Sequence, residues 1–129
     1  MWLEVDTSNA TIDKLRYWYK QSTKVSGKGA RKTEDVDPLM VAKYIIAAAV
    51  TGMKVNGKEA VNIVGHPLTF RDKSLWEKLN VMDSGSAITK LFLGKDAGII
   101  AVGDEIVDAA GYGLDVEVVG EDDVDPLDV

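Results

Sequence analysis

The chain contains no cysteine and one histidine, His66, among its 129 residues. The lack of cysteine excludes a disulfide framework, a thiolate nucleophile and any zinc site built on sulfur. A single histidine also excludes multi-histidine metal sites and leaves little room for imidazole catalysis. We therefore expect no cofactor, no metal and no enzymatic activity.

Long apolar runs are also missing. The most apolar stretch, Leu39–Val50, has twelve residues and contains Lys43, whereas a helix needs about 20 residues to span a bilayer. The first residues lack the basic and apolar regions of a signal peptide. We expect a soluble protein that does not bind membranes and is located in the cytoplasm, or in the host cytoplasm or virion if the chain is viral.

Basic residues are absent after Lys95. Residues 1–95 carry 15 basic and 10 acidic side chains, whereas residues 96–129 carry 11 acidic side chains and no lysine or arginine. The net charge of -6 thus conceals a basic part and a strongly acidic part. Such segregation is typical of proteins whose interactions depend on charge.

The length and the 46% hydrophobic content fit one ordinary globular domain. We expect a mainly α fold, a compact helical domain of about five helices, from the helical spacing of apolar residues. A small β-hairpin is predicted over 53–64 and an edge strand over 114–119, where apolar and acidic residues alternate. The domain then covers 1–119, with a mobile basic loop at 22–36, and 120–129 form an acidic tail.

The first predicted helix covers 9–21, with Ser8 or Asn9 as its N-cap. Four residues recur at helical spacing and are expected to face the core: Ile12, Leu15, Trp18 and Tyr19.

The second predicted helix begins after Asp37, a good N-cap, with Pro38 in its first turn. Gly52 is expected to end it in a left-handed conformation. Because this helix is apolar nearly all round, it must be covered on most sides. It is either the hub of the fold or part of a subunit interface, and we favour the hub.

The Asn56-Gly57 pair indicates a tight turn between two strands, because both residues accept positive φ. A helix over 58–64 is the alternative. Thr69 and Asp72 resemble a capping box that opens a short helix ending near Asn80.

Two more helices are predicted toward the end of the chain. The first starts at Ser84 or Ser86 and ends at Gly94. The second covers 96–110, with two strands joined at Gly103-Asp104 as the alternative, because glycine costs about 1 kcal/mol in a helix.

Three segments resemble functional sites, but each lacks a residue or a setting that the site requires. Gly52–Lys58 matches the spacing of a phosphate-binding loop, but Glu59 stands where the motif requires Ser or Thr. His66 lies between Gly65 and Pro67, which interrupt regular secondary structure, and is expected to make a backbone hydrogen bond in a turn. The acidic run Glu121–Asp125 lacks the glycine and the terminal glutamate of a calcium loop.

The segment 14–32 carries seven basic residues and no acidic one, with Tyr17, Trp18 and Tyr19 among them. Basic and aromatic side chains together can bind nucleic acid. The pI near 4.7 and the expected burial of Trp18 and Tyr19 both disfavour that partner. We therefore expect protein partners instead.

The basic loop and the acidic tail are candidate partners for each other. They can meet within one chain, meet between copies in a head-to-tail contact that builds rings or filaments, or stay solvated and apart. The candidate residues are Lys24, Lys28, Arg31, Lys32, Glu121, Asp122, Asp123 and Asp125.

One stretch resembles a known family. Ile45–Gly52 reads as a helix ending at a Val-Thr-Gly turn, and a polar loop, His66–Phe70 and a short helix bearing Leu75 and Leu79 follow. This order, over residues 40–93, resembles the small tail assembly chaperones of long-tailed bacteriophages. The resemblance implies a mostly helical, non-enzymatic protein that binds tape-measure and tail-tube proteins.

The sequence thus favours a non-enzymatic assembly or interaction protein of bacteriophage morphogenesis, with protein partners that include itself. One alternative is a virion structural subunit, such as a component of a head–tail connector ring. Another is an acidic inhibitor that mimics nucleic acid and binds a basic host protein.

Overall fold

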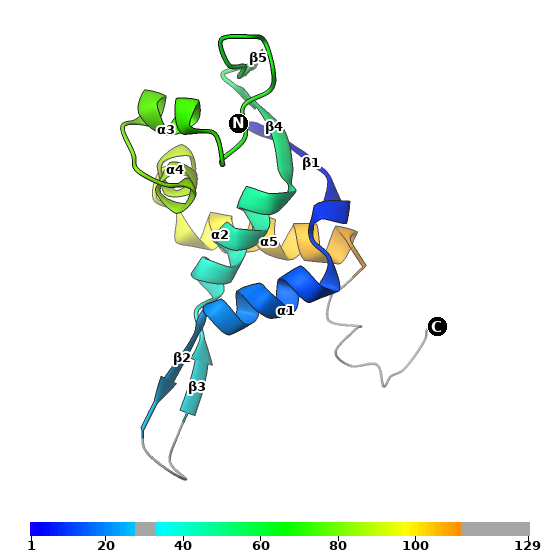
Figure 1. Ribbon diagram of the computed structural model, residues 1–129, viewed down its shortest axis with the longest axis vertical. Helices are drawn as coiled ribbons and strands as arrows, with labels where there is room; N and C mark the ends of the chain where they lie inside the picture. The colour runs from blue at the N-terminus through cyan, green and yellow to red at the C-terminus, as the bar shows by residue number, and fades with distance from the viewer. Residues whose placement is uncertain (28–32, 112–129) are drawn as a thin grey trace.

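The computed structural model describes residues 1–27 and 33–111 (Figure 1). The described part contains five α-helices, as expected, together with two small antiparallel sheets, so the fold is mixed rather than purely helical. The elements in chain order are β1 (Trp2–Val5), the 3-10 helix η1 (Thr7–Asn9), α1 (Ile12–Gln21), β2 (Thr23–Ser26), β3 (Thr33–Val36), α2 (Pro38–Ala49), β4 (Val50–Val55), β5 (Lys58–Glu59), α3 (Lys73–Leu79), α4 (Ser84–Leu91) and α5 (Asp96–Ala109).

Helix α2 is the hub of the fold, as its sequence predicts. The Asp37 carboxylate accepts hydrogen bonds from the backbone N–H groups of Leu39 and Met40, at 3.0 and 3.2 Å. The helix packs against α1, α4 and α5, and its buried residues are Val41, Ala42, Ile45, Ile46 and Ala49. The apolar sequence of α2 is therefore explained by contacts within this chain.

The predicted end of α2 at Gly52 is wrong. The helix ends at Ala49, and Val50, with φ -75° and ψ 123°, already has extended backbone. Gly52 lies in β4 opposite Glu4 of β1, where an added Cβ would meet Glu4 Oε1 at 3.0 Å. Pairing with β1 satisfies the backbone hydrogen bonds of this segment. Glycine at this position leaves room for the side chain of Glu4, which approaches closely.

The larger sheet has the strand order β1-β4-β5. Asn56 and Gly57 have φ of 55° and 79° and form the tight turn that the sequence predicts between β4 and β5. The hairpin begins earlier than predicted, at Val50, and its second strand ends at Glu59. The alternative helix over 58–64 is wrong, because Lys58–Glu59 pair with β4.

The predicted mobile loop at 22–36 is in part a second hairpin. Strands β2 and β3 pair antiparallel, with Thr23 opposite Val36 and Ser26 opposite Thr33. The carbonyl of Ser22 accepts from the N–H of Asp37 at 2.8 Å and fixes the base. The polar composition suggested a loop, but threonine and valine at both ends favour pairing. Figure 1 shows this hairpin projecting away from the helices.

Helix α1 begins later than predicted. Thr11 is its N-cap, while Ser8 donates its N–H and its hydroxyl to Asp6 in the preceding turn. Leu15 and Trp18 are buried as expected. Ile12 and Tyr19 are exposed instead, Tyr19 to 47%.

The inward face of α1 is narrow because one helix, α2, covers most of it. The ring of Trp18 stacks on that of Tyr44 from α2, with centroids 6.4 Å apart. Residues on either side of this contact are left in water.

The short helices α3 and α4 lie close to their predicted positions. The N–H of Thr69 donates to Asp72 Oδ2 at 2.7 Å. Thr69 and Asp72 therefore form the turn that precedes α3, whereas the capping box was predicted to form the first turn of the helix. Asn80, with φ 58°, ends α3, and Gly94, with φ 71°, follows α4 as expected. The N-cap of α4 is Asp83 rather than a serine.

Asp83 should make α4 sensitive to acid. The N–H of Ser86 donates to its carboxylate at 2.7 Å, and this bond lowers the pKa of Asp83, with a smaller contribution from the Ser86 hydroxyl. A carboxylate whose pKa is lowered by folding stabilises the folded state at pH values above its ordinary pKa. This stabilisation is lost as the pH falls through the lowered pKa of the folded state. Asp83→Ala should cost about 1 kcal/mol of unfolding free energy at pH 7. Urea unfolding at pH 7 and pH 3 should show this difference shrinking in acid, and a difference independent of pH would contradict the capping role.

The segment 96–110 forms a helix, so the alternative of two strands is wrong. Gly103 of α5 is buried against α2, where an added Cβ would lie 2.9 Å from Ala42 Cβ and 3.0 Å from Ala42 Cα. Glycine at this position lets the two helices approach closely. None of the described helices is long and apolar enough to cross a membrane.

Candidate interaction surfaces

The structure describes one of the residues predicted to bind a partner. Lys24 lies in β2 and is exposed. Lys28, Arg31 and Lys32, and the acidic residues Glu121, Asp122, Asp123 and Asp125, lie outside the described residues. The predicted edge strand over 114–119 and the tail over 120–129 lie outside them as well. A contact between the basic and acidic segments therefore stays a prediction.

Helix α1 presents basic and aromatic side chains to water beside the β2–β3 hairpin. Tyr17 and Tyr19 are exposed, as are Arg16 and Lys20. Arg16 lies 4.0 Å from Asp13, and both side chains are largely exposed. An exposed pair of this kind contributes little to stability.

The residues that match a phosphate-binding loop form the β4–β5 hairpin instead. His66 is exposed, its N–H donates to Asn62 Oδ1 at 3.0 Å, and its carbonyl accepts from the N–H of Asn62 at 2.8 Å. This confirms its predicted backbone role in a turn. Within residues 1–27 and 33–111, no three histidine or acidic side chains are grouped as metal ligands would be.

The most unusual surface is the loop over residues 61–66, which we call the apolar tip. Ile63 is 101% exposed and Val64 is 69% exposed, and Val61 is exposed as well. Two neighbouring β-branched apolar side chains that are mostly in contact with water are unfavourable for an isolated domain. Ordered apolar groups of this kind are typical of surfaces that bind a partner.

The backbone of the apolar tip is held by Asn62. Its Oδ1 accepts from the N–H groups of Val64 and His66, both at 3.0 Å. Its carbonyl accepts from the N–H of Gly65 at 2.9 Å, and Gly65 has φ 84°. The two apolar side chains are thus presented by a fixed turn, which lowers the entropic cost of binding.

The base of the tip is anchored in the core. The N–H of Leu68 donates to Ala60 at 2.8 Å, and the N–H of Ala60 donates to Met53 at 2.9 Å. Leu68 and Met53 are both buried. The loop therefore extends the β4–β5 hairpin and is attached to the core at its base.

Asn62→Ala tests the role of this side chain. We expect a loss of about 1 kcal/mol in unfolding free energy, because two partly solvated hydrogen bonds are removed. The amide hydrogens of Val64 and His66 should exchange faster by at least about fivefold, as the same free energy implies. Unchanged exchange at both amides would show that the turn does not depend on Asn62.

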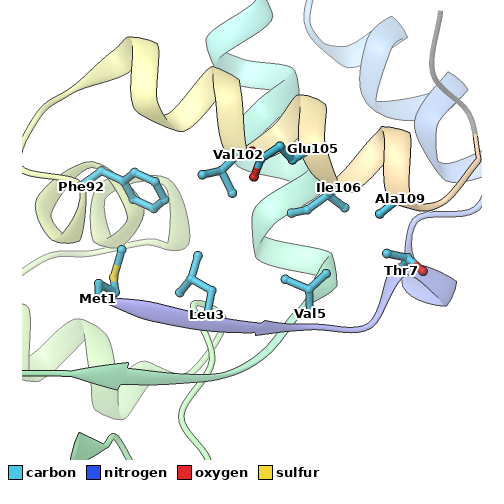
Figure 2. A pocket seen from close by; sticks show the side chains of 9 residues that line it. All are labelled: Met1, Leu3, Val5, Thr7, Phe92, Val102, Glu105, Ile106 and Ala109. Carbon is cyan, nitrogen blue, oxygen red and sulfur yellow. The ribbon is translucent and has the colours of Figure 1, made fainter. Parts of the chain in front are cut away.

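An open apolar groove of about 540 Å³ lies between β1 and α5 (Figure 2). Figure 2 shows Met1 and, from β1, Leu3 and Val5 facing Val102, Ile106 and Ala109 of α5, with Phe92 and Thr7 toward the two ends. Glu105 is the one charged residue among the nine described residues that line the groove. The groove can bind apolar side chains, and its described lining residues do not include a combination of acid, base and nucleophile for catalysis.

Neither surface is predicted by the sequence patterns. Ile63 and Val64 fell inside the predicted hairpin, although Asn62 and Gly65 around them are residues that favour turns. The groove combines residues from 1–7 and from 92–109, which are far apart in the sequence. No family model matches the chain, and comparisons with curated proteins and with solved structures found no match.

Proposed function

We propose that the protein is a non-enzymatic assembly protein that binds copies of itself, and other proteins, through the apolar tip. The full exposure of Ile63 on a loop with a fixed backbone carries this proposal. Burying one such side chain contributes about 1.5–3 kcal/mol. Ile63 and Val64 would form the apolar centre of such a contact, which the residues around them would complete.

The position of the tip favours assembly in a head-to-tail manner. The β4–β5 hairpin and the loop after it lie at one end of the long axis, and the β2–β3 hairpin with Lys24 lies at the other (Figure 1). Contacts between unlike ends build rings or filaments rather than closed dimers. Pairing of Lys24, Lys28, Arg31 and Lys32 with the acidic tail of another copy would add to this contact at low salt.

An enzymatic role ranks behind this proposal. His66 is exposed at the tip, and the hydrogen bonds found for it run through its backbone. If His66→Ala abolished the biological activity of the protein while leaving its assembly intact, the non-enzymatic proposal would fail.

The resemblance of residues 40–93 to tail assembly chaperones is what favours a role in bacteriophage morphogenesis. A tail assembly chaperone leaves after assembly, whereas a connector-ring subunit remains in the particle. Electron microscopy of purified particles with an antibody against this chain separates these two roles.

The contribution of the acidic tail is tested by deleting Gly120–Val129. At low salt, deletion should weaken self-association about fivefold, which corresponds to about 1 kcal/mol for exposed ion pairs. At 1 M salt the two chains should associate equally, because the Debye length falls to about 3 Å. Sedimentation velocity at both salt concentrations measures this, and a monomer with and without the tail at both would contradict the head-to-tail contact.

A further inference from the structure

Strand β1 is an edge strand whose apolar face the described elements cover only in part. It pairs with β4 on one side, and no strand among the described residues pairs with its other side. Met1 is 54% exposed and Val5 is 40% exposed, although both line the β1–α5 groove. An unpaired strand edge beside an open apolar groove is suited to the addition of one more strand.

We propose that Leu114–Val119 of the same chain fills the β1–α5 groove as a strand antiparallel to β1. This segment reads Leu-Asp-Val-Glu-Val-Val, and it lies outside the described residues. In a strand, Leu114, Val116 and Val118 share one face, and Asp115 and Glu117 lie on the other. One face is thus apolar, as the groove requires, and the other is suited to water.

The end of α5 lies at the groove. Ala109, at the end of α5, lines the groove on the same side as Thr7 (Figure 2). Gly111 has φ 88°, and Gly113 follows one residue after Tyr112, so the chain can reverse within a few residues. After such a reversal the segment runs opposite to β1, and its six residues span about 20 Å as a strand.

Charge selects which face of the segment enters the groove. If Asp115 and Glu117 faced inward, they would be desolvated beside Glu105, and like charges repel. With Leu114, Val116 and Val118 inward, only apolar side chains enter. The acidic residues Glu121–Asp125 are unsuitable occupants for the same reason.

The short connection favours the same chain over a second copy. Four residues separate Ala109 from Leu114, and a short tether gives an effective concentration in the millimolar range. A second copy would have to displace this local segment. The groove is therefore a site within the chain, distinct from the apolar tip.

Paired cysteine substitutions test the proposal in the full chain, which has no cysteine of its own. The antiparallel arrangement places Val5 opposite Leu114 and Leu3 opposite Val116. Leu3→Cys combined with Val116→Cys should form a disulfide within one chain. The control, Leu3→Cys with Glu117→Cys, places the second sulfur on the opposite face, so its oxidation should be at least about tenfold slower.

Mass spectrometry and non-reducing gels distinguish the outcomes. A disulfide within one chain, formed preferentially by the Val116 pair, supports the proposal. Equal rates for the two pairs, no intramolecular disulfide, or a disulfide-linked dimer each overturn it, and the dimer identifies a second copy as the occupant.

Hydrogen exchange provides a second measurement that leaves β1 unaltered. Val116→Asp should speed exchange of the β1 amides that point away from β4 at least about tenfold, whereas Glu117→Gln should leave them unchanged. Unaltered exchange in Val116→Asp would overturn the proposal even if the cysteine variants failed to fold.

Discussion

Replacing Ile63 and Val64 together by serine is expected to weaken self-association by about tenfold or more. Each apolar side chain contributes on the order of 1.5 kcal/mol or more when buried in a contact, and about 1.4 kcal/mol corresponds to a factor of ten. The free energy of unfolding should change by less than about 0.5 kcal/mol, because Ile63 is 101% exposed in the free chain. Light scattering over a dilution series gives the association constant, and urea unfolding gives the stability.

Met82→Ser is the matched control for this variant. Met82 is 87% exposed but lies between α3 and α4, outside the apolar tip. It should leave self-association unchanged. If both variants weakened association equally, exposed apolar surface in general, rather than the tip, would be responsible.

Gly103→Ala is expected to destabilise the fold by about 1–3 kcal/mol, the usual effect of overpacking a core. The added methyl group would lie 2.9 Å from Ala42 Cβ and 3.0 Å from Ala42 Cα. Relief requires α2 and α5 to move apart, since the backbone of Ala42 cannot rotate away as a long side chain can. Urea unfolding, followed by circular dichroism, measures the loss.

Gly98→Ala in the same helix is the control. An added Cβ there would lie 3.9 Å from Lys95 Cβ, which is an ordinary contact. Alanine should therefore stabilise α5, by up to about 1 kcal/mol, through its higher helix propensity. The account of the contact between α2 and α5 fails if both glycine variants change stability in the same direction.

Local chemistry made several elements predictable. Asp37 and Pro38 mark the start of α2, Asn56-Gly57 marks the tight turn, and Gly94 follows α4, because each depends on groups within a few residues. The hub position of α2 was also predictable, since a helix that is apolar on all sides must be covered by other elements on most sides.

The predictions were wrong where contacts with another segment of the chain determine the local structure. Gly52 looked like a helix end, but pairing with β1, almost fifty residues earlier, places it in a strand. Tyr19 matched the apolar spacing of α1 yet is exposed, because α2 covers a narrow face around Trp18. The composition of residues 22–36 suggested a loop, although β2 and β3 pair with each other.

The candidate surfaces were less predictable than the fold. Charge segregation predicted binding residues within Lys24–Lys32 and Glu121–Asp125, and most of these lie outside the described residues. The apolar tip depends on the exposed fraction of Ile63 and on the bonds to Asn62, and neither can be read from apolar spacing. The groove requires β1 and α5 to lie together, which no local pattern indicates.

The most direct test of the central claim is the mass of the unaltered chain in 1 M salt, measured by sedimentation equilibrium over a hundredfold range of protein concentration. At this salt concentration charge contacts are screened within about 3 Å, whereas burial of apolar side chains persists. Assembly through the apolar tip predicts a mass that rises with concentration above the 14.0 kDa of one chain. A mass of 14.0 kDa at every concentration would contradict it.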